Sequence, residues 1–198
     1  KQFLDFAENC RLDSYSRNLS VVLLTDIDLT GVDFAGIPIF CGNFDGNGHT
    51  VSGLSITRDG SNMGLFRYVD ASALIQNLTV SGEIIPDGSR SAVGGIAGHN
   101  AGKIQNCFFD GTVSGSDDVG GIAGTMGVEN LLDPEEDNKD EGTSLLRTSY
   151  TVSAVLIGNT NEGSVTAKKD MVGGIVGQEE LGLVTACESY GDVTGVNQ

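Results

Sequence analysis

The chain has 198 residues, of which 39% are hydrophobic and 29 are glycine, a length and composition typical of one domain. Its 27 acidic and 11 basic side chains give a formal net charge of -16, which repels phosphate backbones and anionic lipid and argues against nucleic acid as a partner. No run of about 18 apolar residues exists, so the sequence predicts no membrane insertion by this chain.

The first thirteen residues predict a short amphipathic helix. Phe3, Phe6, Ala7 and Cys10 recur at intervals of three and four residues, which places them on one helical face. Because the end of a repeat stack exposes its core and its open strand edges, we expect residues 1–13 to form an N-terminal capping helix. A membrane-surface helix is the alternative, and the acidic excess of the segment argues against it.

From Val21 onward the chain is built from an internal repeat. The hexapeptide VGGIAG occurs at 93–98 and 119–124, and VGGIVG follows at 172–177. Short runs between the copies alternate apolar and polar residues and close with Gly, Asn, Asp or Ser, as strands joined by turns do. One such unit cannot bury its apolar face alone, so the units are expected to stack. We predict an all-β, right-handed parallel β-helix of about six rungs that forms one domain over residues 1–198.

The repeats align on a fixed spacing of apolar and small residues, which predicts columns in the core. The first column is expected to contain Ile75, Ile104, Leu146 and Val184. The neighbouring column is expected to contain Leu78, Cys107, Ser149 and Cys187. The same alignment matches Gly82, Gly111, Ser153 and Gly191, and then Ile84, Val113, Val155 and Val193. Two earlier segments keep the first part of the spacing, at Val51, Leu54 and Ile56 and at Leu24, Ile27 and Leu29.

These motifs together carry a family resemblance. FDGNGHT at 44–50, GLF at 64–66 and VGGIAGHNAGKIQNCFFDGTVSG at 93–115 resemble the GLUG-type repeat region of bacterial cell-surface proteins. The same pattern is similar to the β-helical region upstream of the protease domain in M26-family immunoglobulin A1 proteases. The resemblance covers nearly the whole chain from Val21, and it implies a β-helix without implying one function. Since the chain starts at Lys1 and stops where another repeat would begin, we expect it to be a piece of a longer protein.

One segment breaks the repeat period. From Ile122 to Leu146 there are 24 residues, where Ile96 to Ile104 takes eight, so about sixteen are inserted. We expect residues 127–143 to form an exposed acidic loop, because insertions in solenoids become loops on one face. A second run of extra residues, at 159–170, is expected to make a longer turn beside it.

Alternating carboxylates in the acidic loop raise the question of calcium. Asp133, Glu135 and Asp137 repeat the ligand spacing of calcium loops, but the glycine at the sixth position and the distant bidentate glutamate are missing. A charged loop is ordinarily a solvated one. We predict no metal ligands and no cofactor, and calcium binding between Asp133 and Glu141 stays an open alternative.

The four cysteines are read as buried thiols. Cys107 and Cys187 share a register position two rungs apart, about 9 to 10 Å, and a disulfide needs Cα atoms within about 7 Å. Cys10 and Cys41 meet only if the N-terminal cap folds over the coil that holds Cys41. No CxxC pair is present, which argues against zinc.

No catalytic residues are predicted. His49 lies in the FDGNGHT turn and His99 directly follows a VGGIAG copy, and neither has a partner in the sequence that would make a nucleophile pair. Asp117 and Asp118 are adjacent, so they point to opposite faces of a strand or sit in a turn, and either arrangement argues against paired carboxylate catalysis. The sequence therefore argues against an enzyme.

Two functional hypotheses follow. The first is a noncatalytic structural or adhesive module of a secreted or cell-surface bacterial protein, which presents loops to a protein partner. The second is a substrate-positioning β-helical region of a large secreted M26-like metalloprotease whose catalytic domain lies outside this chain. No small-molecule ligand is indicated by the sequence.

Overall fold

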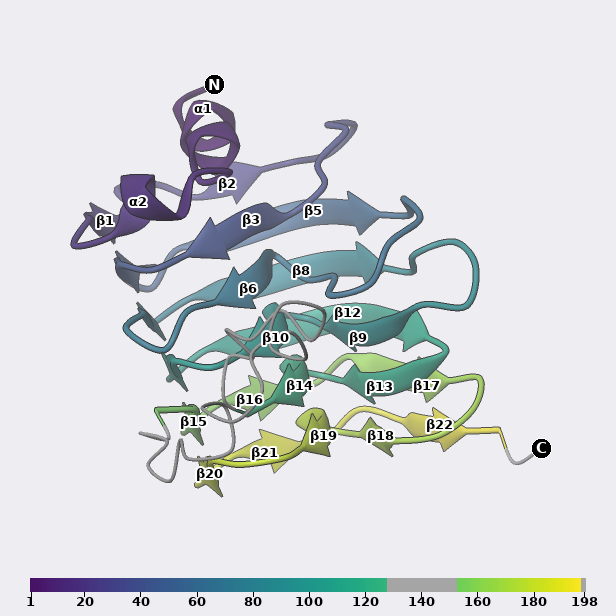
Figure 1. Ribbon diagram of the computed structural model, residues 1–198. Helices are drawn as coiled ribbons and strands as arrows, with labels where there is room; N and C mark the ends of the chain where they lie inside the picture. The colour runs from purple at the N-terminus through teal and green to yellow at the C-terminus, as the bar shows by residue number, and fades with distance from the viewer. Residues whose placement is uncertain (128–152, 197–198) are drawn as a thin grey trace, which may run out of the picture.

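The computed structural model describes residues 1–127 and 153–196, and these residues are mostly β, with two short helices at the N-terminus. The strands form four sheets, and every strand pair within the described residues is parallel. Successive passes of the chain lie one above the other from the N-terminal to the C-terminal end (Figure 1). The architecture is a β-helix-like stack, in which each pass is one coil.

Each coil places short strands in the same sheets. Sheet A contains β1 (Ser20–Val22), β4 (Asn43–Asp45), β7 (Leu74–Gln76), β11 (Lys103–Gln105), β15 (Val155–Ile157) and β20 (Leu183–Thr185). Sheet B contains β2 (Ile27–Asp28), β5 (Thr50–Ile56), β8 (Thr79–Ile84), β12 (Phe108–Gly115), β16 (Thr160–Asn161), β17 (Ser164–Ala167), β21 (Glu188–Ser189) and β22 (Val193–Gly195). Sheet C contains β3 (Ile37–Phe40), β6 (Phe66–Val69), β10 (Ala97–Asn100), β14 (Ala123–Met126) and β19 (Val176–Glu179). Sheet D contains β9 (Ser91–Gly94), β13 (Asp117–Gly120) and β18 (Val172–Gly173).

The corner between sheets A and B is turned by one residue in the left-handed conformation. In four successive coils this residue is Asn77, Asn106, Gly158 and Ala186, with φ of 53°, 52°, 64° and 52°. Asparagine and glycine adopt the left-handed backbone conformation at low cost, which explains why they occur at this point of the repeat. The same corner recurs in each of these coils, so the flanking strands stay in register.

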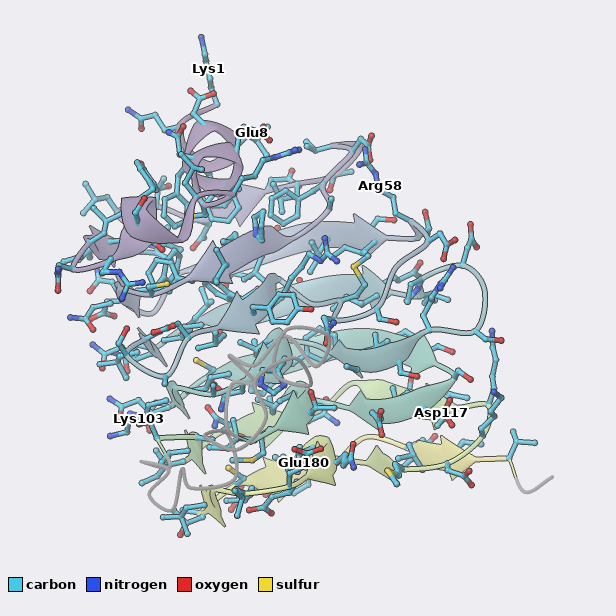
Figure 2. All side chains as sticks on the ribbon, in the orientation of Figure 1. Lys1, Glu8, Arg58, Lys103, Asp117 and Glu180 are labelled. Atoms are coloured by element: carbon cyan, nitrogen blue, oxygen red, sulfur yellow. The ribbon has the colours of Figure 1, made fainter. Side chains whose placement is uncertain are left out.

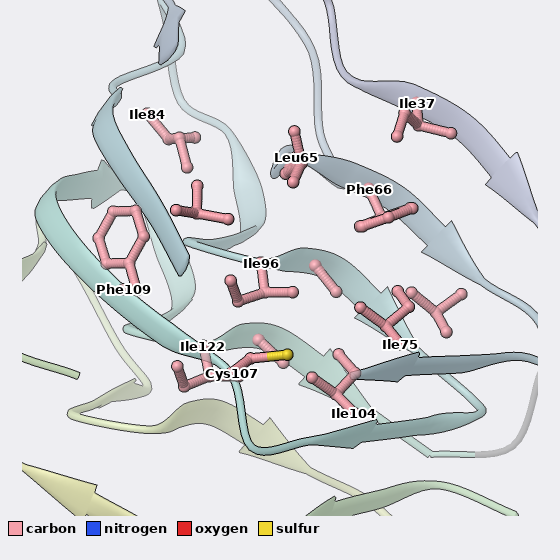
Figure 3. Packing of buried hydrophobic residues seen from close by; sticks show 14 of the residues in the cluster. Ile37, Leu65, Phe66, Ile75, Ile84, Ile96, Ile104, Cys107, Phe109 and Ile122 are labelled. Carbon is pink, nitrogen blue, oxygen red and sulfur yellow. The ribbon is translucent and has the colours of Figure 1, made fainter. Parts of the chain in front are cut away.

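The first predicted column is confirmed at three of its four positions. Ile75 pairs with Ile104 across β7 and β11, and all of the column members from Phe44 to Leu156 are buried. Figure 2 shows the side chains on the whole stack, and Figure 3 shows Ile75 above Ile104 and Ile96 above Ile122 inside it. The complete column is Val21, Phe44, Ile75, Ile104, Leu156 and Val184.

The prediction of Leu146 in this column was wrong, because Leu156 and not Leu146 follows Ile104. The neighbouring column therefore contains Asn159 where Ser149 was expected, between Cys107 and Cys187. Asn159 is fully buried, and its side chain accepts from the Cys107 amide at 2.9 Å and donates to the Ile104 carbonyl at 2.9 Å. Those two bonds allow an amide to stand in an apolar column.

The shift has two further consequences for the alignment. Val165, not Val155, pairs with Val113, so Ser153 and Val155 do not hold the positions expected of them. Residues 159–170, expected as a longer turn, include the sheet B strands β16 and β17.

The earlier segments were also aligned wrongly. Val51 pairs with Val80 in sheet B, so it does not belong to the column of Ile104. Ile27 pairs with Val51 and lies in sheet B as well. The position expected of Val51 is taken by Phe44, which the apolar-spacing rule passed over.

A column of glycines lines sheet B. Gly82 pairs with Gly111, and Gly163 and Gly191 continue the column in the next two coils. A Cβ on Gly111 would collide with the Gly82 carbonyl oxygen, and one on Gly191 would collide with that of Gly163. Only glycine lets the backbones of consecutive coils approach this closely.

The N-terminal end of the stack holds the two helices. α1 (Gln2–Asn9) packs on β3, and its Phe6 ring lies 6.0 Å from Phe40 and 6.1 Å from Phe44 between centroids. The helix ends before the expected boundary at residue 13, and a second helix, α2 (Asp13–Ser16), was not anticipated. The buried Ser16 hydroxyl in α2 accepts a bond from the Cys41 amide at 3.0 Å.

The four cysteines form no disulfide. Cys107 and Cys187 flank Asn159 in one column, as expected of thiols two coils apart. Burial raises the pKa of the Cys107 thiol to about 12, and burial followed by the proximity of Cys41 raises the pKa of Cys10 to about 11. The N-terminal segment thus does bring Cys10 close to Cys41.

These environments predict an order of alkylation. Iodoacetamide reacts with the thiolate, so at pH 8 the native protein should be modified first at the partly exposed Cys187 and far more slowly at the buried Cys107. Peptide mass mapping over time measures both sites, and unfolding in urea should equalise them. Early modification of Cys107 in the folded state would contradict its placement in the core.

Candidate interaction surface

Charged side chains of alternating sign follow one edge of the stack, where the chain leaves sheet B; all but Asp117, the first residue of β13, lie in the connecting turns. Arg58 donates from Nε to Asp33 Oδ1 at 3.0 Å across neighbouring coils, and Arg90 pairs with Asp59 in the same way. Farther along, Lys169 Nζ lies 4.0 Å from Asp117 Oδ2. We call this set the charged corner: Asp33, Arg58, Asp59, Arg90, Asp117 and Lys169.

The fold explains why these residues gather. Sheet B strands end with buried side chains such as Ile56 and Ile84, and the residues that come next turn outward into solvent. Because each coil repeats this exit point, the turns stack above one another, and Arg58 and Asp117 lie on the same side of the molecule, opposite Lys103 (Figure 2). Exposed ion pairs add little stability, so the charged corner contributes little to holding the fold.

The adjacent carboxyls near the charged corner have opposite electrostatic environments. The amide of Asp170 donates to Asp117, which lowers the pKa of that carboxyl. Burial, followed by repulsion from Asp117 and Glu180, raises the pKa of Asp118. Asp118 has a left-handed backbone with φ of 56°, so the two side chains do not follow simple strand alternation.

His99 has a hydroxyl partner that the sequence analysis missed. Its Nδ1 lies 2.8 Å from Thr125 Oγ1, and its ring lies 6.2 Å from that of Tyr68. Burial lowers the pKa of His99. The signal was present in the repeat, because His99 and Thr125 each directly follow a VGGIAG copy and pair between β10 and β14. A hydroxyl and a base at this distance can exchange a proton, but among the described residues no carboxylate is hydrogen-bonded to His99 to complete a triad.

His49 has a structural partner. Its Nδ1 lies 3.0 Å from Asp26 Oδ1 in the preceding coil. The Thr50 amide donates to the same oxygen at 2.9 Å, and this bond, followed by the one to His49, lowers the pKa of Asp26. These contacts tie the FDGNGHT turn to the coil before it.

Metal ligands were not predicted, and the open calcium alternative lies outside the part of the chain that can be tested. Asp133, Glu135, Asp137 and Glu141 all fall in residues 128–152, which are not among the described residues. Within 1–127 and 153–196, no three His, Cys, Asp or Glu side chains are close enough together to hold a metal ion. Over the same residues, no helix has the length and apolar character needed to cross a membrane.

Comparison with known proteins shows which sequences the repeat resembles. The family model for the GLUG motif matches residues 89–114. Halomucin of Haloquadratum walsbyi is 32% identical over 142 residues, which is 66% of this chain and 2% of that protein. A "Putative Gly-rich membrane protein" of Evansella cellulosilytica is 35% identical over 96 residues, 42% of this chain and 11% of that protein. The chain thus spans a small part of the curated relatives it matches.

A solved structure shares the fold. The crystal structure of a "putative immunoglobulin A1 protease" from Bacteroides ovatus superposes with a TM-score of 0.55 at 20% identity, and the match covers 91% of this chain and 62% of that one. At this identity the likeness concerns the fold alone.

Proposed function

Because residues 89–114 carry the GLUG motif, we propose that this chain is a noncatalytic, right-handed β-helix module of about six rungs in a secreted or cell-surface bacterial protein. It forms one domain, with residues 1–13 as a cap and residues 127–143 as an acidic insertion, and it presents its turns to a protein partner. No cofactor takes part. A net charge of -16 repels phosphate backbones, which argues against nucleic acid as a partner.

The observation that supports binding to a protein partner is the charged corner. Its residues sit at stacked turns and, for Asp117, at the start of β13, so their spacing is set by a buried core. Their alternating signs favour a partner of complementary pattern. Loops held by a rigid scaffold are where binding residues concentrate. The two similar proteins, Halomucin and the Gly-rich membrane protein, support a place at the cell surface.

A second candidate is a substrate-positioning region of a secreted M26-like metalloprotease. The supporting observation is the shared fold over 91% of the chain with the Bacteroides ovatus protein. In that role the charged corner would hold a substrate protein for a catalytic domain on another part of the same polypeptide.

Binding without cleavage tests the proposal. The immobilised chain should bind at least one purified protein from a panel of extracellular proteins and leave it intact, as read by interferometry followed by gel electrophoresis. Arg90→Glu reverses one charge of the charged corner. It should weaken that binding about ten-fold, because a negative charge of the partner that complements Arg90 would then meet a carboxylate. Lys103→Glu is the matched control, because it makes the same charge change on the opposite side of the stack.

The panel also separates the two candidates. Binding confined to immunoglobulin A1 favours the protease region, and binding to other surface proteins favours the adhesive module. Equal loss in Arg90→Glu and Lys103→Glu would refute the charged corner as the contact surface. Cleavage of any panel member by the purified chain would refute the noncatalytic assignment.

A further inference from the structure

A polar hollow lies beside the capping segment, at the N-terminal end of the charged corner. It has a volume of about 500 Å³, within the range typical of small-molecule sites. One wall comes from α1 and the other from the segment leading into β3 and from β6. Its apolar lining consists of Leu4, Ala7, Phe34, Ala35 and Pro38.

Arginine dominates the polar lining. Three of the chain's 11 basic residues, Arg11, Arg58 and Arg67, line this one hollow, together with Glu8 and Asp33 as its acidic residues. Three positive and two negative charges leave a local balance of +1 in a chain whose net charge is -16. The hollow is therefore an exception to the charge of the chain as a whole.

Of the three arginines in the hollow, Arg67 is the one that forms no ion pair with an acidic side chain among residues 1–127 and 153–196. Arg11 pairs with Glu8 at 2.8 Å and Arg58 pairs with Asp33, but Arg67 donates only to backbone carbonyls, from Nε to Asn62 at 3.3 Å and from Nη2 to Ser61 at 3.2 Å. Among the described residues no carboxylate forms an ion pair with it. Its guanidinium is thus oriented by the backbone while its charge is left unmatched, and it retains donors for a ligand.

The fold does not require an arginine at this position. Phe66 pairs with Ala97, so the residue in register with Arg67 in the next coil is Gly98, and in the two coils after that it is Gly124 and Gly177. The stem of Arg67 instead lies against Gly36, where an added Cβ would come within 3.0 Å of its Cγ. This position is Pro38 in the preceding coil and glycine in the three coils that follow, and here it holds a long cation that lines the hollow.

We propose that this hollow binds a small organic monocarboxylate. The planar fork of Arg67 matches the two oxygens of a carboxylate, and the apolar wall of Leu4, Phe34 and Pro38 takes the carbon frame. The acidic partners Glu8 and Asp33 offset two of the three arginines, which favours one negative charge over the two of a phosphate monoester. The site shares Asp33 and Arg58 with the charged corner, whereas Arg67, which would bind the carboxylate, lies outside that set.

The test titrates the ¹⁵N-labelled chain with four probes: D-glucuronate, benzoate, neutral D-glucose and inorganic sulfate. Glucuronate, benzoate or both should shift amide signals of residues 34–38, and glucose should not. Arg67→Gln should weaken carboxylate binding about ten-fold, since a hydrogen bond to a charged group is lost. Arg90→Gln is the matched control, because it removes an arginine that does not line the hollow.

Two further variants keep the outcome interpretable if Arg67→Gln is destabilised. Arg67→Lys keeps the charge without the fork and should bind less tightly than wild type, and Arg58→Gln should weaken binding by leaving Asp33 to repel the ligand. A response to both carboxylates indicates a site for free acids, and a response to glucuronate alone indicates an acidic sugar. Equal shifts with glucose, sulfate preferred to both carboxylates, no response to either carboxylate, or unchanged binding in Arg67→Gln and Arg58→Gln would each overturn the proposal.

Discussion

Gly111→Ala should destabilise the chain by about 3 kcal/mol, at the upper end of the usual cost of overpacking. The new Cβ would collide with the Gly82 carbonyl oxygen on the adjacent strand, and neither group is the mobile end of a side chain. Relief requires the two coils to separate, which would weaken the parallel ladder between β8 and β12. Urea denaturation followed by circular dichroism measures the difference.

Gly48→Ala is the control for this prediction. Gly48 has φ of +77° and open space around it, so alanine there meets only the cost of a left-handed backbone, about 1 kcal/mol. If Gly111→Ala proved no more harmful than Gly48→Ala, the close contact between glycines of successive coils would not be a determinant of stability.

Phe40→Ala should lower the free energy of unfolding by about 3–5 kcal/mol, the range for large cavities in a core. Phe40 is fully buried, and its ring centroid lies 6.0 Å from Phe6, 6.0 Å from Phe44 and 5.5 Å from Phe66. Removing the ring takes away contacts of both α1 and the first coils at once. Amide hydrogen exchange should therefore speed up in α1 as well as in β3.

Tyr190→Ala provides the comparison for Phe40→Ala. It also removes an aromatic ring, but from a residue that is 69% exposed, so the change should stay within about 0.5 kcal/mol. A small effect of Phe40→Ala, close to that of Tyr190→Ala, would mean that the aromatic cluster does not anchor the N-terminal segment.

Repetition is what made the fold predictable. The VGGIAG copies and the spacing from Ile75 to Ile104 determine the register of neighbouring coils, and the pairings of Ile75 with Ile104 and of Gly82 with Gly111 agree with it. The parallel sheets follow from the same pattern. Where a motif occurs in two neighbouring coils, their register could be predicted from the sequence without knowledge of tertiary contacts.

The alignment failed where the core contains polar residues. The spacing rule selected Leu146, because three residues after Leu156 stands an asparagine, Asn159, where the rule expects an apolar or small residue. Asn159 and Asn161 are both fully buried. Asn161 satisfies itself by bonding to the amide and carbonyl of Gly163 at 3.0 Å each. A rule that counts hydrophobic residues cannot recognise an asparagine that is buried because the backbone around it supplies its partners.

The candidate sites were the least accessible to sequence reasoning. The charged corner joins residues about one coil apart, such as Asp59 and Arg90, and the pair of His99 with Thr125 needs the register before it can be seen. The hollow beside α1 depends on where the N-terminal segment lies, which no repeat specifies. Pairings between coils become predictable once the register is known, and contacts made by a nonrepeating segment do not.

The left-handed corner between sheets A and B also bears on how such a chain changes length over evolution. Asn77, Asn106, Gly158 and Ala186 end equivalent strands with nearly the same backbone geometry, so a cut at one of them and a join at another restores the turn. Recombination between two such corners adds or removes a whole coil and leaves the strands on either side facing their proper neighbours. Tandem duplication at this corner can therefore lengthen a short stack by whole coils. Each longer chain would keep its strands paired and would be able to fold.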